Sequence, residues 1–167
     1  FADAGATGSR YKVWLPVAGQ PLANLLLEGT ESRSRQGNVD GSINDDDPQS
    51  HVTTFDGKPA AADWFAVTLD QPASGRRVAF LSGNVYHDGG WFDTSTGKPC
   101  VQIQRNAGGP WETIGELTNY PATTATDGDA LKHLQNRFTL DLSEPVSFTA
   151  VRVDRKSTRL NSSHGKL

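Results

Sequence analysis

Residues 63–70 read Asp63-Trp64-Phe65-Ala66-Val67-Thr68-Leu69-Asp70, and this stretch decides the fold class. Phe65, Val67 and Leu69 alternate with smaller or more polar side chains. This period of two is typical of a β-strand that buries one face. The stretch therefore predicts a strand on the core of a β protein, and the rest of the chain can be placed around it.

A second run of the same kind follows after a proline. Proline cannot donate a hydrogen bond to a neighbouring strand, so Gln71-Pro72 predicts a break between two strands. Residues 77–81 then place Val78 and Phe80 on one face. We expect these two runs to be neighbouring strands of a β-sandwich.

Further segments repeat the pattern and are separated by turn residues, as in sandwich folds. Residues 33–48 are polar and predict a loop, and residues 126–135 predict a short helical turn. The sequence predicts an all-β jelly-roll sandwich of seven or eight strands. The additional predicted strands are residues 24–29, 99–104, 111–117, 138–142 and 148–153.

Composition limits both the fold and the function. The chain has 167 residues, enough for one domain, and its 17 glycines and 9 prolines favour many short strands. No apolar run approaches the length that crosses a bilayer. Residues 1–153 carry 12 basic and 18 acidic residues, a net charge of −6 that opposes binding to nucleic acid.

The two ends are expected to lie outside the domain. Residues 1–20 predict a linker or the end of a preceding domain, and the chain does not start with Met, as expected of a fragment. Residues 154–164 match the translation of a common sequencing-library adapter. We therefore expect residues 154–167 to be a non-native tail and the β-sandwich domain to span residues 21–153.

No catalytic motif is visible. A Ser nucleophile elbow, a zinc-binding HExxH, a Walker-type loop and a dinucleotide fingerprint are all missing. Glu112 and Glu116 would share one face of a strand, where carboxylates are usually only solvated. Cys100 is the one cysteine, so no internal disulfide can form, and it is either an ordinary thiol or pairs outside this fragment.

A loop after the second strand carries candidate sugar-binding residues. It holds Tyr86, His87, Asp88, Trp91 and Phe92 among several glycines. Sugar rings stack on flat aromatic faces, and their hydroxyls bind to neighbouring polar side chains. The alternative is a loop that folds back over the core and buries Trp91 and Phe92.

An acidic loop offers oxygen ligands for a metal. Residues 38–48 contain Asp40 and Asp45 among further aspartates and asparagines. Ca²⁺ takes six to eight oxygen ligands, although the spacing does not match an EF-hand. A solvated acidic loop without metal is the alternative.

The order of these segments resembles the discoidin, or coagulation factor V/VIII C-type, domain. The resemblance covers about residues 24–153. It is carried by Asn24-Leu25-Leu26-Leu27, Val39-Asp40-Gly41, the central stretch at residues 63–69, Arg77-Val78-Ala79-Phe80, Trp111-Glu112-Thr113-Ile114 and Phe148-Thr149-Ala150-Val151-Arg152-Val153.

This resemblance implies a galactose-binding-like jelly roll with ligand contacts on loops at one end, similar to bacterial carbohydrate-binding modules. It implies a structural Ca²⁺ near the Asp-Gly loop, with Asp40 and Asp45 as ligands. It also implies a final strand that this chain lacks. His51 is a further candidate sugar ligand, in addition to the five named between residues 86 and 92.

We therefore expect a non-catalytic carbohydrate-binding module of a larger secreted bacterial protein, plausibly attached to a glycoside-active enzyme. Its partners would be a glycan and the neighbouring domains of its own chain, outside the cell or in the periplasm. Trp91 or Tyr86 would stack on the sugar, while His87 and Asp88 would bind its hydroxyls. The alternative is a module that docks on a protein or a neighbouring domain without binding glycans.

Overall fold

The computed structural model describes residues 23–54, 62–82, 90–124, 126–132 and 136–155. These residues form an antiparallel β fold, as predicted. Its strands are β1 (Thr30–Arg33), β2 (Val39–Asp40), β3 (His51–Val52), β4 (Asp63–Ser82), β5 (Cys100–Gln104), β6 (Glu112–Glu116) and β7 (Asn136–Arg155). One sheet has the order β1-β4-β7-β5-β6, and β2 pairs with β3 separately.

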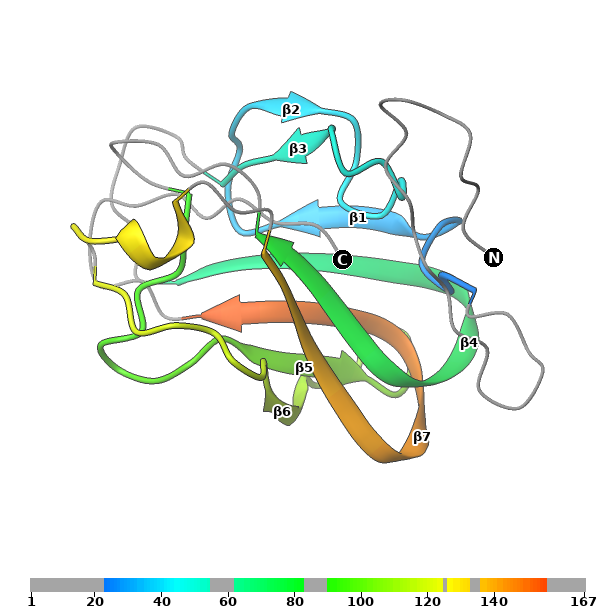
Figure 1. Cartoon of the computed structure of the whole chain (residues 1–167). Helices are drawn as coiled ribbons and strands as arrows, with labels where there is room; N and C mark the ends of the chain where they lie inside the picture. Colours follow the sequence, from blue (N-terminus) through cyan, green and yellow to red (C-terminus); the bar gives the residue numbers. More distant parts are fainter. Residues whose placement is uncertain (1–22, 55–61, 83–89, 125, 133–135, 156–167) are drawn as a thin grey trace, which may run out of the picture.

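Strands β4 and β7 are each 20 residues long and pair with each other along nearly their whole length. The runs predicted as separate strands, at 63–70 and 77–81, are two halves of β4. In place of the predicted break there is a shift of register between Thr68 and Ala73, around Pro72, which cannot donate a backbone hydrogen bond. Figure 1 shows β4 and β7 bending together, so that their two halves lie in different layers.

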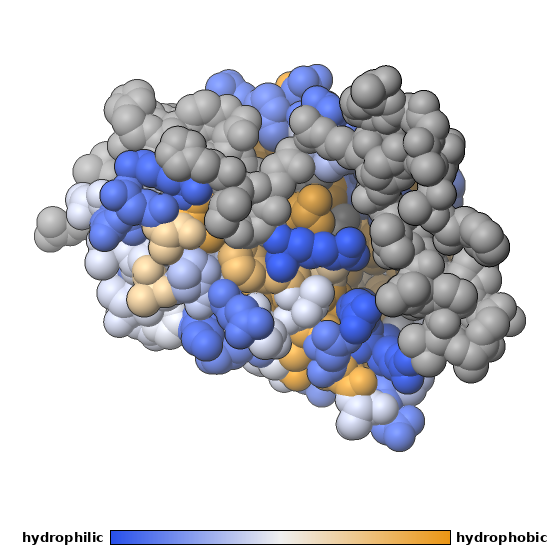
Figure 2. All heavy atoms as spheres, in the orientation of Figure 1, coloured by the Kyte–Doolittle hydropathy of each residue, from blue (hydrophilic) through white to orange (hydrophobic). Residues whose placement is uncertain are grey.

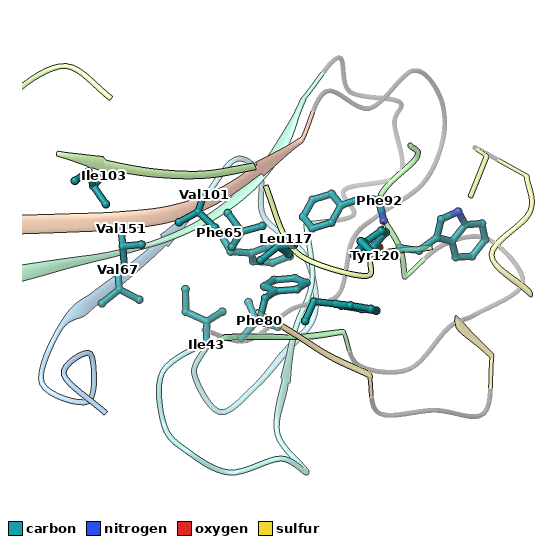
Figure 3. Packing of buried hydrophobic residues seen from close by; sticks show 14 of the residues in the cluster. Ile43, Phe65, Val67, Phe80, Phe92, Val101, Ile103, Leu117, Tyr120 and Val151 are labelled. Carbon is teal, nitrogen blue, oxygen red and sulfur yellow. Dashed lines mark hydrogen bonds between the residues drawn. The ribbon is translucent and has the colours of Figure 1, made fainter. Parts of the chain in front are cut away.

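The core lies between these layers and is built on aromatic rings. Phe65, in the first half of β4, and Phe80, in the second half, have ring centroids 6.1 Å apart. Phe92 lies 5.6 Å from Phe80 and 6.2 Å from Tyr120. Figure 3 shows these four rings facing one another, with Val101 and Leu117 beside them. Phe65 and Val67 are fully buried and Thr68 and Asp70 are exposed, as predicted, whereas Ala66, predicted on the outer face, is also buried.

The first strand begins later than predicted. Residues 25–28 form a turn, and β1 starts at Thr30. The Asn24 side chain accepts a hydrogen bond from the Leu26 N–H at 3.0 Å, and the Gly29 N–H donates to the Leu26 carbonyl at 2.9 Å. An asparagine that binds the backbone two residues on favours a turn over a strand. The prediction of a strand at residues 24–29 is therefore wrong for the leucines, and Leu25 and Leu27 are exposed in the turn.

The other predicted elements lie close to their expected places. Strands β5 and β6 fall within residues 99–104 and 111–117, and the predicted helical turn is a 3₁₀ turn at Asp129–Leu131. No helix in the described residues has the length and apolar character to cross a bilayer. Figure 2 shows hydrophobic residues in the middle of one face of the molecule, bordered by hydrophilic ones.

Strand β7 continues two residues past the boundary expected at Val153. Asp154 pairs with Trp64 and Cys100, and Arg155 pairs with Asp63. Arg155 is buried, and its Nε donates to the Asp93 carbonyl at 2.8 Å. Strand β7 therefore includes the first two residues of the predicted tail, and the non-native origin of residues 154–167 stays a prediction.

A buried ion pair fixes the start of β4. Asp63 is fully buried, and its carboxylate lies 3.1 Å from the Arg35 guanidinium. Ser34 also donates to this carboxylate at 3.1 Å. Burial raises the pKa of Asp63, and the Arg35 charge opposes that rise. Removing the arginine would leave a carboxylate in the interior without its opposite charge, which is costly.

We expect Arg35→Ala to lower the free energy of unfolding by about 3–5 kcal/mol at pH 7, measured by urea denaturation. The loss should shrink near pH 4, because the pKa of the unpaired Asp63 rises further and its neutral form needs no partner. Arg77→Ala is the control, since it breaks an exposed pair with Asp141 and should cost less than about 1 kcal/mol. Equal losses for both variants would contradict the role given to Arg35.

Candidate functional site

Of the candidate sugar ligands other than Trp91 and Phe92, the structure describes only His51. Tyr86, His87 and Asp88 lie outside the described residues. His51 lies on β3, half-buried, directly opposite Asp40 of β2. These four residues therefore remain predicted ligands, with His51 the one whose position is known.

Trp91 lies in the interior, with 4% of its surface exposed. Its indole Nε1 donates to the Thr124 carbonyl at 2.7 Å. The ring lies against Gly128, where an added Cβ would come within 2.5 Å of it. A ring enclosed in this way has no free face for a sugar, so the predicted stacking role of Trp91 is wrong.

Phe92 is also enclosed, with 1% of its surface exposed. Its ring belongs to the aromatic core, and its backbone N–H donates to the Tyr120 hydroxyl at 2.9 Å. Burial raises the pKa of Tyr120, so this hydroxyl stays neutral. For Trp91 and Phe92 the alternative interpretation, a segment folded back on the core, is the correct one.

We expect Trp91→Ala to destabilise the fold by about 3–5 kcal/mol, as large truncations in a core do. Trp91→Phe should lose less, because it keeps most of the ring and gives up one hydrogen bond. Thermal unfolding followed by circular dichroism measures both. A Trp91→Ala variant as stable as the parent chain would contradict this placement.

Asp45 organises the acidic loop through its own hydrogen bonds. One carboxylate oxygen accepts from the Ser42 N–H at 2.9 Å and from the Ser50 hydroxyl at 2.5 Å. The other accepts from the Asp47 N–H at 2.9 Å. Gly41 precedes this turn with a φ of +89°, a conformation that favours glycine. These bonds are what a turn-forming aspartate makes.

Asn44 closes the same loop from the inside. It is buried, and its amide nitrogen donates to the carbonyl oxygens of Leu26 and, at 3.0 Å, Gly29. The Leu27 carbonyl lies 3.4 Å from the same nitrogen. The amide oxygen accepts from the Ser42 hydroxyl at 2.6 Å. One side chain thus satisfies backbone groups of the turn that precedes β1.

These contacts bear on the calcium expectation. Backbone carbonyls and carboxylates are the ligands Ca²⁺ prefers, but here the carbonyls converge on an amide nitrogen, which cannot bind a cation. No three His, Cys, Asp or Glu side chains in the described ranges lie close enough together to hold a metal. Asp40, on β2, is exposed, and Asp45 is engaged in the turn. The donor set around Asp40 and Asp45 fits a hydrogen-bonded loop better than a calcium cage.

We expect the melting temperature of the chain to be the same in EDTA and in millimolar CaCl₂. Asn44→Asp should make the melting temperature depend on calcium, because several carbonyl oxygens repel a carboxylate that faces them unless a cation lies between. That variant should melt lower in EDTA and recover with CaCl₂. Differential scanning fluorimetry measures all four conditions, and a calcium-dependent parent chain would show that the loop does bind the metal.

The predicted carboxylate pair and the cysteine show no catalytic arrangement in the described residues. The Glu112 carboxylate binds the Arg105 guanidinium at 2.8 and 2.9 Å on the surface, which lowers the pKa of Glu112. Glu116 is exposed. Cys100 is a free, half-buried thiol whose pKa is raised by burial. Cys100 lies opposite Glu116 in the pairing of β5 with β6, and its thiol donates to the Asp154 carbonyl at 3.4 Å.

A second aromatic and polar cluster, missed in the sequence, lies on the outer face of the five-stranded sheet. The Arg152 guanidinium carbon lies 4.3 Å from the centre of the Trp111 ring and 5.7 Å from that of Trp64. Its Nε donates to the Gln102 side chain at 2.7 Å. Both tryptophans are partly exposed. We call Trp64, Gln102, Trp111 and Arg152 the outer-face cluster.

Strand register was the information needed to find this cluster. Gln102 lies opposite Arg152 in β5 and β7, and Trp64 lies opposite Asp154 in β4 and β7. The alternation along each strand shows which side chains point away from the core. It does not show which strands are neighbours, so residues almost ninety positions apart could not be matched.

Comparison with solved structures shows the fold. The chain aligns with the family 32 carbohydrate-binding module of Clostridium perfringens NanJ in complex with galactose, at 12% identity and a TM-score of 0.57, over 86% of this chain and 97% of that one. It aligns with a Clostridium perfringens carbohydrate-binding module in complex with GalNAc-β-1,3-galactose, at 9% identity and a TM-score of 0.54, over 83% and 95%.

A third similar structure is chitosan-binding module 2, in complex with chitotriose, of a chitosanase/glucanase from Paenibacillus sp. IK-5. It has 14% identity and a TM-score of 0.53, over 84% of this chain and 98% of that one. No family model matches the chain, and no curated protein sequence matches it. The chain therefore has the galactose-binding-like β-sandwich fold of family 32 carbohydrate-binding modules.

Proposed function

We propose that this chain is a carbohydrate-binding module that binds its ligand without catalysis. The observation that carries the proposal is the fold, which aligns over more than four fifths of the chain with modules solved in complex with sugars. A fold by itself hosts many functions, so the proposal needs a site as well. The described residues add aromatic and hydrogen-bonding side chains of the kind that sugars require, and no catalytic arrangement.

The primary site would lie at the loop end that contains His51. The half-buried imidazole of His51 sits on β3, a short strand paired only with β2 in the described residues, and it can donate to or accept from a hydroxyl. Tyr86 would supply the stacking ring now that Trp91 and Phe92 are assigned to the core. His87 and Asp88 would bind further hydroxyls. This site depends on residues outside the described ranges and is tested by mutation.

The wider setting belongs to the same proposal. A module of this kind would belong to a larger secreted bacterial protein, and a glycoside-active enzyme is the parent that fits it best. Binding would keep that enzyme near its polysaccharide and raise the local concentration of its substrate. The module itself would contribute affinity and no chemistry.

We expect the chain to bind at least one of galactose, chitotriose and GalNAc-β-1,3-galactose, measured by isothermal titration calorimetry. Tyr86→Ala should weaken binding about tenfold or more, because it removes the stacking ring. Tyr86→Phe is the matched control and should keep most of the affinity, since the ring remains. His51→Ala should weaken binding less than Tyr86→Ala.

Two results would count against this proposal. Failure of all three sugars, and of a wider glycan array, to bind the folded chain would overturn the function. Full affinity in Tyr86→Ala, with binding otherwise present, would overturn the loop-end site alone. Each variant needs a melting temperature close to that of the parent chain for the comparison to hold.

A further inference from the structure

We propose that the outer-face cluster is a second sugar-binding surface, formed on the flat of the sheet and separate from the loop end. The choice of a sugar as ligand rests on the proposed function. The position and chemistry of the site rest on contacts among residues that the structure describes. The ligand we infer is an uncharged hexose unit, within an oligosaccharide, that lies across Trp111 and Trp64.

The cluster draws on neighbouring strands of the sheet. Trp64 comes from β4, Arg152 from β7 and Gln102 from β5, and Trp111 directly precedes β6. Strands β4, β7, β5 and β6 are consecutive in the sheet. Val151, Val153 and Val101, which flank these residues in β7 and β5, are buried on the opposite face. The cluster thus forms a row of side chains across the face that points away from the core.

The polar groups of the row are held in place before any ligand arrives. Arg152 donates to Gln102 at 2.7 Å, and the Gln102 amide nitrogen donates to the Thr113 hydroxyl at 2.9 Å. The guanidinium is also held near both indole rings. Side chains already fixed by neighbours lose little conformational freedom on binding, which favours affinity. Guanidinium, amide and hydroxyl groups together can donate to and accept from sugar hydroxyls.

The charge of the cluster favours a neutral ligand. The Arg152 guanidinium lies 3.0 Å from the Asp154 carboxylate, and both side chains are largely shielded, with 17% and 19% exposed. This pair leaves the row with no net charge. An anionic ligand such as a phosphate or nucleic acid would have to compete with Asp154 for the arginine, whereas a neutral hydroxyl can bind beside it.

The mixed character of the row argues for a sugar over a protein partner. Protein interfaces are usually built around a desolvated apolar centre. Here the centre is an arginine with its glutamine, and the guanidinium lies over the Trp111 ring, so a ligand would use the part of that ring that stays exposed. Alternating ring faces and hydrogen-bonding groups match a sugar, whose C–H face and hydroxyls alternate in the same way.

The experiment uses the tryptophan indole signals in a ¹⁵N-labelled sample of the full chain. The chain has four tryptophans, and Trp64→Phe and Trp111→Phe assign the two signals of the cluster. Galactose, chitotriose and GalNAc-β-1,3-galactose are the probes. We expect the Trp64 and Trp111 signals to shift on titration, while the signal of buried Trp91 stays in place.

Mutants then separate this surface from the loop end. Arg152→Gln should weaken the binding reported by the Trp64 and Trp111 signals about tenfold or more, and Trp111→Ala should weaken the binding reported by the remaining Trp64 signal to the same extent. Arg77→Gln is the matched control, because Arg77 on β4 is also paired with an aspartate, Asp141 on β7, but lies away from the cluster, and this substitution should change nothing. Tyr86→Ala should leave the shifts at Trp64 and Trp111 unchanged.

The outcomes distinguish the two proposals. Sugar binding that is lost in Tyr86→Ala, with unmoved Trp64 and Trp111 signals, would overturn the second surface and keep the proposed function. No binding of any probe would overturn both. Concentration-dependent shifts at Trp64 and Trp111 without sugar, with the Trp64 shift abolished by Trp111→Ala, would overturn the sugar site and show instead that the surface joins two copies of the chain.

Discussion

The antiparallel pairing of β4 with β7 is the interaction on which the rest of the structure depends. Both strands bend at the same level, so one continuous pair of strands belongs to both layers of the sandwich. Phe65 and Phe80 lie on the two halves of a single strand, and the bend brings their rings together. Strands β1, β5 and β6 add to one layer only. Without this pair neither the core nor the flat outer face would exist.

Local patterns of the sequence predict local features of this fold well. The alternation in residues 63–70 identifies the buried face of β4, and the proline at Pro72 marks the shift in register. The same reasoning fails at residues 24–29, where a hydrophobic run forms a turn because Asn24 binds the backbone two residues ahead. In that case a few local hydrogen bonds favour the turn, and an apolar pattern cannot reveal them.

The candidate site depends on contacts between distant parts of the chain, so less of it could be predicted. Trp91 and Phe92 have the composition of a binding loop, yet their surroundings are supplied by Gly128, Thr124 and Tyr120, which come some thirty residues later. Arg152 and Trp64, by contrast, look like ordinary strand residues. Only the order of the strands in the sheet shows that these two side chains lie close together. Two kinds of aromatic residue, those that fill the core and those on the outer face, therefore cannot be separated by composition.

The long β4 and β7 pair also has a consequence for how the chain reaches this structure. Asp63 pairs with Arg155, so one end of the central pair joins residues more than ninety positions apart in the chain. Contacts of such high sequence separation require the closure of a large loop before they contribute, and proteins dominated by them acquire their native state in milliseconds to seconds. During that interval the apolar halves of β4 have no partner, and a nascent chain would be open to association with its neighbours. We therefore expect the same long pairing that positions the core and the outer-face cluster to make folding of this chain slow.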